Sequence, residues 1–257
     1  MTISDGTIAI MNAIPAPIAA SFRNGALITR ALRPLVNRLL PDRPAWIVVR
    51  SGPARGLRLL IEPKTEKFYW SGTHEVAVQQ TVWRILRPGM TFWDVGAHIG
   101  FFSLLASRRV EDRGLVHAFE PMAQNRARLQ AAIERNSVTN VTVHEQAIGA
   151  TSGEAILHGH ESSLMWTLRP ERGTLQGLTV SCRRLDKLSE SLPPPDLIKI
   201  DAEGAEVDVL RGGLKLLSRS KPPLIVEFSN DAFVEEARTL LSFYEFSRLA
   251  PHHWLLV

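Results

Sequence analysis

Cysteine and long apolar runs are nearly absent from this 257-residue sequence. The single residue Cys182 excludes an intramolecular disulfide and fits a reducing compartment. No segment approaches the roughly 20 apolar residues that a membrane-spanning helix requires. The apolar stretch 7–20 lacks a basic leader and contains two prolines, which makes it a poor signal peptide. We therefore expect a cytoplasmic protein without a transmembrane segment.

Histidines with the spacing of a zinc site are lacking as well. His158 and His160 form one pair, and His252 and His253 form another. Neither pair has a cysteine or acidic partner at metal-binding spacing, so we expect both pairs to be exposed. The sequence therefore assigns no metal ligands.

Basic residues are concentrated at the amino terminus. Residues 1–60 contain eight arginines and only two acidic residues, although the net charge of the whole chain is only +4. A nucleic-acid enzyme would instead carry its basic residues around the active site. We therefore expect no nucleic-acid partner.

The segment 26–40 has apolar residues at helical spacing, with arginines on the other faces. We expect an amphipathic helix that packs on the main domain or on a second copy of the chain, which leaves a homodimer open. The less favoured alternative is contact with a membrane surface, because interfacial aromatic residues are missing. We assign residues 1–45 to a tail and this helix, and residues 46–257 to the main domain.

Short apolar strands alternate with helical patterns along the main domain. A hairpin is expected over 46–61, a helix over 75–86 and a terminal hairpin from 246–249 and 254–257. Between them, strands are predicted at 91–95, 115–119, 141–144, 154–158, 178–183, 197–200 and 224–228, and helices at 99–109, 123–136, 205–217 and 233–241. This order predicts an α/β fold with a doubly wound, mostly parallel sheet.

The most informative motif is DVGAHIG at 94–100, which follows an apolar strand and leads into a helix. Its glycines allow a tight turn, and the helix directs free backbone N–H groups at the turn. Glu120 ends the next strand about 20 residues later, where an acidic residue commonly binds ribose hydroxyls. Asp94 would repel a pyrophosphate and attract a cationic group. The motif therefore favours S-adenosylmethionine over NAD.

Polar residues also follow the strand at 141–144. Gln146 could bind the exocyclic amine of an adenine, and Ala147 could offer its backbone N–H to a ring nitrogen. These two residues are candidates for the base-binding end of a nucleoside site.

A second group of acids follows the strand at 197–200. Acids at the carboxyl end of a central strand are costly to hold there without a cation, a metal or a hydroxyl to bind. We therefore assign Asp201 a functional role, with Glu203 beside it. Glu206 is interpreted as a first-turn helix charge that the helix dipole favours.

The combined motifs resemble the FkbM family of S-adenosylmethionine-dependent methyltransferases over 73–229. The motifs that carry the resemblance are DVGAHIG, AFEP, an AIG after the third strand, DLIKIDAEGAE and a closing IVEF. The resemblance implies a class I methyltransferase fold, in which one antiparallel strand closes a parallel sheet, so that residues 46–257 would be a methyltransferase domain.

The resemblance also implies a set of cofactor contacts. Asp94, Gly96 and Gly100 would line the methionine end, together with Ala97 and His98 of the same loop. The ribose would meet Glu120, the adenine Ala147, and the ammonium group Glu75. His98 is a departure, since the family usually has asparagine there, and it puts a titratable group near the donor.

Methyl transfer from a sulfonium requires in-line positioning and removal of the acceptor's proton. Asp201 is the candidate base, or a ligand of a divalent ion that acidifies the hydroxyl, and Glu227 could assist. The resemblance implies a hydroxyl of a sugar, glycolipid or secondary metabolite as acceptor. The alternatives are a nicotinamide oxidoreductase, which the missing Tyr-x-x-x-Lys pair disfavours, and a catalytically silent cofactor-binding protein.

Overall fold

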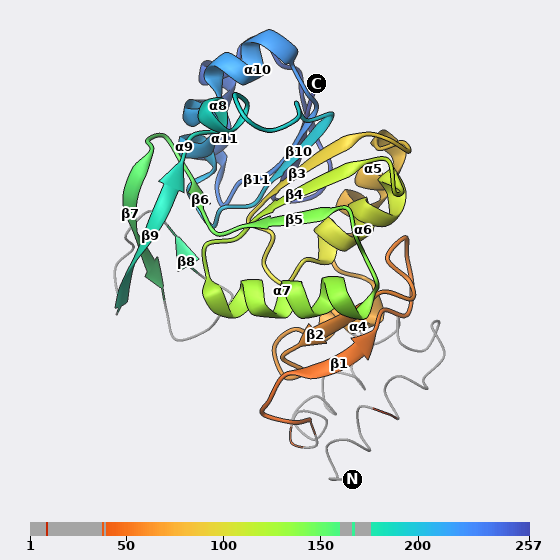
Figure 1. Cartoon of the computed structure of the whole chain (residues 1–257). Coiled ribbons are helices and arrows are strands. Elements are labelled where there is room, and N and C mark those ends of the chain that lie inside the picture. Colours follow the sequence, from red (N-terminus) through yellow and green to blue (C-terminus); the bar gives the residue numbers. More distant parts are fainter. Residues whose placement is uncertain (1–8, 10–37, 39, 160–165, 168–175) are drawn as a thin grey trace.

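The computed structural model describes residues 9, 38, 40–159, 166–167 and 176–257 (Figure 1). The predicted tail, most of the helix predicted over 26–40 and His160 lie outside the described residues. Within the described ranges, no helix is long and apolar enough to cross a lipid bilayer.

The centre of the molecule is a seven-stranded sheet with the order β12-β13-β11-β10-β3-β4-β5. Strands β5, β4, β3, β10 and β11 run parallel, and β13 runs antiparallel to both of its neighbours, β11 and β12. The strands are β3 (Thr91–Val95), β4 (Leu115–Phe119), β5 (Val141–His144), β10 (Leu197–Ile200), β11 (Leu224–Glu227), β12 (Phe246–Arg248) and β13 (His253–Leu256). This topology confirms the predicted fold class and the terminal hairpin.

Helices cover both faces of the sheet (Figure 1). Phe92 and Trp93 are neighbours on β3 and fully buried, yet they belong to separate cores because successive side chains point to opposite faces. One core contains α5 (Val76–Ile85), α6 (Phe101–Val110) and α7 (Ala123–Arg135). The other contains α8 (Leu185–Leu188), α9 (Glu206–Gly212), α10 (Leu214–Ser220) and α11 (Asp231–Leu240).

The single helix predicted over 205–217 is wrong, because two short helices meet at Gly213. Gly212, just before the break, packs so closely that an added Cβ would lie 2.1 Å from the carbonyl oxygen of Gly149. Helices α4 (Lys67–Ser71) and α8 were not predicted, since each is too short to show a helical period.

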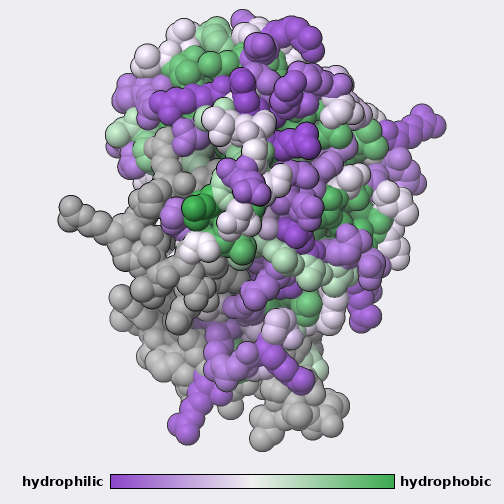
Figure 2. Space-filling model, turned by 60° about the vertical axis from the view of Figure 1, so that its left-hand side comes forward, coloured by the Kyte–Doolittle hydropathy of each residue, from purple (hydrophilic) through white to green (hydrophobic). Residues whose placement is uncertain are grey.

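Two smaller sheets flank the centre. The predicted hairpin is present as β1 (Ala45–Val48) and β2 (Arg58–Ile61). A four-stranded sheet of order β6-β9-β7-β8 contains β6 (Ala147–Ile148), β7 (Gly153–Gly159), β8 (Trp166–Thr167) and β9 (Gln176–Arg183). Figure 2 turns the side of the molecule that carries this sheet toward the viewer, and hydrophilic residues surround smaller apolar patches there.

Candidate functional site

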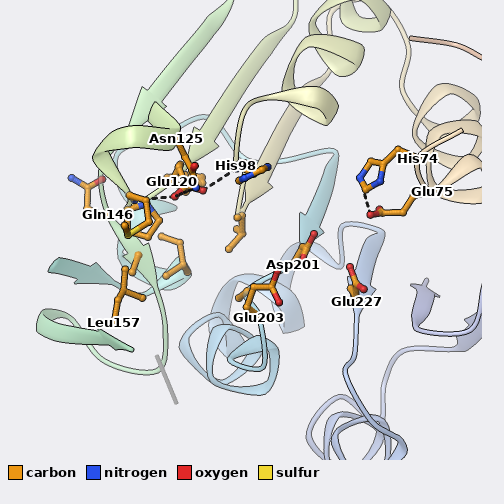
Figure 3. A pocket seen from close by; sticks show the side chains of 18 of the residues that line it. His74, Glu75, His98, Glu120, Asn125, Gln146, Leu157, Asp201, Glu203 and Glu227 are labelled. Atoms are coloured by element: carbon orange, nitrogen blue, oxygen red, sulfur yellow. Dashed lines mark hydrogen bonds and ion pairs between the residues drawn. The ribbon is translucent and has the colours of Figure 1, made fainter. Parts of the chain in front are cut away.

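A cavity of about 400 Å³ lies at the carboxyl ends of the central strands (Figure 3). This is the edge at which parallel α/β sheets bind ligands, and the volume falls within the usual range for small-molecule sites. Its wall includes eight of the predicted site residues, namely Glu75, Gly96, His98, Glu120, Gln146, Ala147, Asp201 and Glu227. The predicted site residues on this wall come from several separate segments of the chain.

Gly96 allows the loops after β3 and β10 to approach closely. Its φ of 79° lies in the left-handed region, and an added Cβ would lie 1.7 Å from the carbonyl oxygen of Asp201. The N–H groups of Gly96 and Ala97 both donate to the carbonyl oxygen of Phe119 at 3.0 Å. The turn is thus held to the end of β4, where Glu120 begins.

Glu120 is fixed in place by hydrogen bonds from the backbone. Its Oε2 accepts from the N–H of His98 at 2.8 Å, and its Oε1 accepts from the N–H of Met122 at 2.8 Å. The side chain is buried at the cavity wall, and burial raises its pKa to about 7. Two oxygens with four lone-pair sites leave acceptor capacity for ribose hydroxyls.

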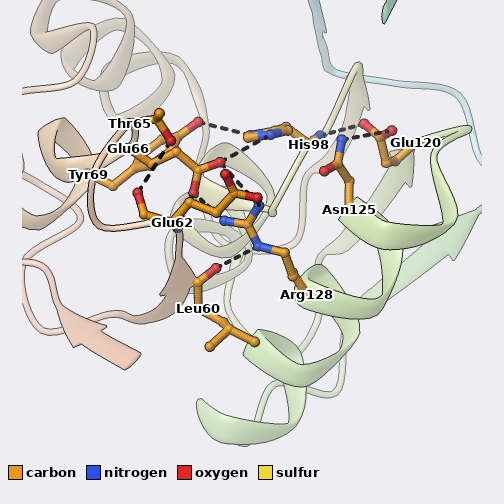
Figure 4. Close-up of polar contacts among 9 residues, drawn as sticks. All are labelled: Leu60, Glu62, Thr65, Glu66, Tyr69, His98, Glu120, Asn125 and Arg128. Carbon is orange, nitrogen blue, oxygen red and sulfur yellow. Dashed lines mark hydrogen bonds and ion pairs between the residues drawn. The ribbon is translucent and has the colours of Figure 1, made fainter. Parts of the chain in front are cut away.

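His98 connects this acid to a buried network behind the cavity (Figure 4). Its backbone is left-handed, with a φ of 49°, a conformation that asparagine and histidine tolerate better than most residues. Its Nδ1 lies 3.2 Å from the hydroxyl of Tyr69. Burial, and then the positive charge of Arg128, lower the pKa of His98 to about 3, so the ring is neutral. The titratable group expected near the donor therefore carries no charge at neutral pH.

Glu66 and Arg128 form the base of this network, and the sequence analysis missed both. The Glu66 side chain is fully buried and pairs with the guanidinium of Arg128 through both carboxylate oxygens. Arg128 also donates from Nε to the carbonyl oxygen of Leu60 at 2.9 Å. This pair ties α7 to the β1–β2 hairpin beneath the loop that contains His98.

Gln146 lies on the same side of the cavity as Glu120 (Figure 3), and Ala147, the next residue, also lines the cavity. Ala147 begins β6, where it pairs with Cys182 of β9, and it is almost fully buried. Leu157 of β7, which the sequence analysis did not single out, contributes an apolar surface nearby. An apolar wall with an amide beside it suits a planar base.

Asp201 lies on the other side of the cavity, beside a buried lysine. Its Oδ2 accepts from Lys199 Nζ at 2.9 Å, and that ammonium lies 4.8 Å from the centroid of the Phe102 ring. Burial, together with the negative charges of Glu227 and Glu75, raises the pKa of Asp201 although Lys199 opposes the shift. Burial opposes the charge of Lys199, but Asp201, Glu75 and Asp94 outweigh it and raise the lysine pKa.

Glu75, Glu227 and His253 meet at the same end. His253 Nε2 lies 3.1 Å from Glu75 Oε2 and 3.3 Å from Glu227 Oε2. The expectation that His253 would be exposed and without acidic partners is therefore wrong, because the antiparallel strand β13 places it opposite Glu227 on β11. His252 is exposed as expected, and His158 is half-buried.

The charges of this group are coupled. Burial disfavours ionisation of Glu75, but the imidazoles of His253 and His74 outweigh it and hold the Glu75 pKa far below its ordinary value. Burial would lower the pKa of His253, but the two glutamates raise it to about 9. At neutral pH the group therefore holds one positive imidazolium between two carboxylates.

Glu203 and Glu206 differ in role. Burial, and then the charges of Asp201 and Glu227, raise the pKa of Glu203 at the cavity wall to about 8. Glu206 is in the first turn of α9, as predicted, and its Oε1 accepts from the N–H groups of Ala202 and Gly204. Glu206 therefore shapes the loop that presents Asp201.

Three predicted cofactor contacts, Asp94, Ala97 and Gly100, are not among the residues that line the cavity. Ser103 Oγ donates to Asp94 Oδ2 at 2.5 Å, and burial raises the pKa of this acid. Gly100 precedes α6, and an added Cβ there would lie 2.1 Å from Leu129 Cδ1. Their predicted contacts with the methionine end stay predictions.

Comparison with known proteins gives a consistent result. The model of the FkbM methyltransferase domain matches residues 94–248. A hexuronic acid methyltransferase, AglP of Haloferax volcanii, is 28% identical over 152 residues, which cover 58% of this chain and 60% of that protein. Methyltransferase 1 of Beauveria bassiana is 28% identical over 141 residues, which cover 46% of this chain and 56% of the relative. The chain thus spans about three-fifths of the curated relatives that it matches.

Solved structures resemble the chain more distantly. A methyltransferase FkbM from Methylobacillus flagellatus superposes with a TM-score of 0.49 and 17% identity, covering 74% of this chain and 54% of the other. A tRNA (uracil-54, C5)-methyltransferase from Pyrococcus abyssi, in complex with S-adenosylhomocysteine, superposes with a TM-score of 0.48 and 13% identity. The match covers 84% of this chain and 44% of the other.

Proposed function

Because the chain belongs to the FkbM methyltransferase family, we propose that it transfers a methyl group from S-adenosylmethionine to a hydroxyl group of a sugar, glycolipid or secondary metabolite. One observation carries the proposal beyond family membership. A single cavity has an oriented carboxylate, Glu120, at one side and a cluster of acids at the other (Figure 3). A nucleoside that ends in a cationic amino acid matches that arrangement.

The donor would lie across the cavity with its adenosine at the end of Glu120 and its sulfonium toward the end of Asp201. Glu120 would accept from the ribose hydroxyls, and Gln146 with Ala147 would bind the adenine. The sulfonium would then face Asp201, because opposite charges attract most strongly where water is excluded. Gly96 supports this placement, since its lack of a side chain lets the loop that carries Asp201 lie against the turn.

Asp201 is the proposed base for the acceptor hydroxyl. In the transfer, the hydroxyl oxygen bonds to the methyl carbon, the carbon–sulfur bond breaks, and the hydroxyl proton passes to the carboxylate. A carboxylate whose pKa is raised toward neutrality is the stronger base, and burial raises that of Asp201. Glu227 at the neighbouring strand end is the weaker candidate, because, although burial opposes the shift, His253 lowers its pKa.

The acceptor class has one further support. AglP, a relative over three-fifths of its length, is described as a hexuronic acid methyltransferase, so sugars are the first acceptors to examine. Family membership removes the support for a nicotinamide oxidoreductase. The alternative of a catalytically silent cofactor-binding protein would be excluded by measured turnover.

The proposal is tested by methyl transfer from labelled donor to a panel of hexuronic acids, neutral hexoses, glycolipids and hydroxylated metabolites. Calorimetric titration with S-adenosylmethionine and NAD accompanies it. We expect saturable one-to-one binding of S-adenosylmethionine and label on at least one sugar. Binding of NAD without binding of S-adenosylmethionine would overturn the proposal.

A further inference from the structure

The cluster of Glu75, Glu227 and His253 is built from three separate elements. Glu75 precedes α5, Glu227 ends β11 and His253 begins β13. One ligand atom from each lies within 4.8 Å of the other two. Glu75 and Glu227 also line the cavity, and Figure 3 shows their carboxylates directed toward each other. The cluster is thus part of the cavity wall.

Two buried atoms of this cluster lack an aligned hydrogen bond. The His253 side chain is 9% exposed, and its Nε2 makes no hydrogen bond within the described residues, although two carboxylate oxygens lie 3.1 and 3.3 Å away. Glu75 Oε2 is likewise buried without a hydrogen bond. Buried polar atoms are rarely left so in native proteins. One ligand atom of each of the three residues is therefore close enough to the others to share an ion.

The acids around this cluster favour the binding of a cation. Asp201 and Glu203 lie on the same part of the wall as the two glutamates. The buried cation Lys199 is bonded to Asp201. His74 lies on the outer oxygen of Glu75, with its Nε2 2.9 Å from Oε1. The proton of His253 supplies the positive charge between Glu75 and Glu227, and a metal ion bound there would take its place.

We propose that Glu75, Glu227 and His253 bind one divalent transition-metal ion at the acceptor end of the cavity, and that the ion displaces the proton of His253. Ligand atoms about 2.1 Å from an ion lie roughly 3–3.5 Å from each other, close to the separations of His253 Nε2 from the two carboxylate oxygens. One imidazole and two carboxylates suit Mn²⁺, Fe²⁺ or Zn²⁺ better than Mg²⁺. Three protein ligands leave at least one position open toward the cavity, as in catalytic metal sites.

The role of the ion rests on the proposed function. An acceptor hydroxyl in the open position would be acidified by the metal and aimed at the donor, and its proton would pass to Asp201. The ion would also offset the negative wall, so that an acidic sugar could enter. This assignment gives Glu75 to the metal and not to the cofactor's ammonium group.

Manganese titration followed by electron paramagnetic resonance tests the site directly. The signal of free Mn²⁺ disappears on coordination, so it reports binding to the full chain without S-adenosylmethionine or any acceptor. We expect one ion per chain, with displacement by Zn²⁺ at lower concentration than by Mg²⁺, since imidazole ligands favour zinc. No loss of the free signal, or equal displacement by Mg²⁺, would overturn the proposal.

Matched variants separate coordination from general attraction by the acidic wall. Glu227→Gln and His253→Gln should each weaken Mn²⁺ binding about tenfold or more, in line with the usual cost of altering a metal site. Glu203→Gln removes an acid from the same wall outside the cluster and should weaken binding less than about threefold. Equal losses in Glu227→Gln and Glu203→Gln would contradict coordination.

Donor affinity is measured by calorimetry on the same variants, and donor binding shows that a variant has folded. The same measurement distinguishes failure of the metal site from failure of the proposed function. Donor binding without manganese binding rejects the metal site and leaves the proposed function intact. Manganese binding without donor binding rejects the proposed function and leaves the metal site intact.

Discussion

The two ends of the cavity are built in different ways. At one end, Glu120 and the backbone N–H groups that hold its carboxylate come from one continuous stretch, β3 to α7. The end at Asp201 joins the start of α5, the loop after β10, the end of β11 and the start of β13. The first end is fixed by local hydrogen bonds, and the second by balanced charges between distant segments. We expect substitutions at the first to affect donor binding, and at the second to affect turnover.

The largest effect is expected at Asp201. Asp201→Asn removes the proposed base and should lower turnover by about 100-fold or more, while donor affinity changes little. Steady-state transfer of labelled methyl and calorimetry measure the two effects. Asp208→Asn, an acid of α9 paired with Arg211, is the matched control and should leave turnover unchanged. Normal turnover in Asp201→Asn would break the proposed division of roles.

The next effect concerns donor binding. Glu120→Ala removes a charged acceptor of two ribose hydroxyls and should cost about 1.5–3 kcal/mol of donor affinity. Glu145→Ala is the control, because its side chain is 70% exposed and paired only loosely with Arg126. Unchanged affinity in Glu120→Ala would remove Glu120 from the ribose site.

The glycine of the turn tests the close approach between the two ends. Gly96→Ala would place a methyl group 1.7 Å from the carbonyl oxygen of Asp201, so the loops must separate. Gly89 also has a positive φ, but an added Cβ there would meet nothing within 4 Å. Gly89→Ala should therefore lower the free energy of unfolding only by the backbone strain, about 1 kcal/mol. Denaturant unfolding should show a clearly larger loss for Gly96→Ala. Equal losses would show that the loops do not constrain each other.

The smallest effect is the pH dependence of donor binding. Burial raises the pKa of Glu120 to about 7 in the free protein, so the carboxylate is mostly protonated below that pH. Donor affinity should therefore rise between about pH 6 and pH 8, by at most about tenfold. Calorimetry across this range should show a flatter profile for Glu120→Gln. An unchanged profile would assign the titration to another acid.

The effect of pH on the stability of the fold has the opposite sign to its effect on donor affinity. The folded Glu120 holds its proton up to about pH 7, whereas the unfolded residue releases it near its ordinary value of 4.5. Between these values the folded state binds more protons, so this group's contribution to the free energy of unfolding falls as pH rises.

The sequence predicted most of the central sheet because its strands are short apolar runs that end in polar residues. The bounds predicted for β3, β4, β5 and β10 agree with the structure. Helix ends were less predictable, as in the segment 205–217, where two helices meet at Gly213 and the adjacent Gly212 packs against the loop at Gly149. Short elements such as α4 contain too few residues for any periodicity.

The candidate site was predictable where its residues lie in one motif. Glu120 could be identified from its spacing to the glycines, and the structure places it on the cavity wall. His253 could not, since only the antiparallel pairing of β13 with β11 brings it to Glu227. Glu66 and Arg128 were missed for the same reason, because their pairing depends on α7 packing against the hairpin.

A crystal structure with bound S-adenosylhomocysteine tests the central claim most directly. The account predicts ribose hydroxyls on the carboxylate of Glu120, adenine against Gln146 and Ala147, and the sulfur atom facing Asp201. A ligand bound in the reverse direction, with its amino-acid end at Glu120, would contradict it, as would a ligand bound outside this cavity.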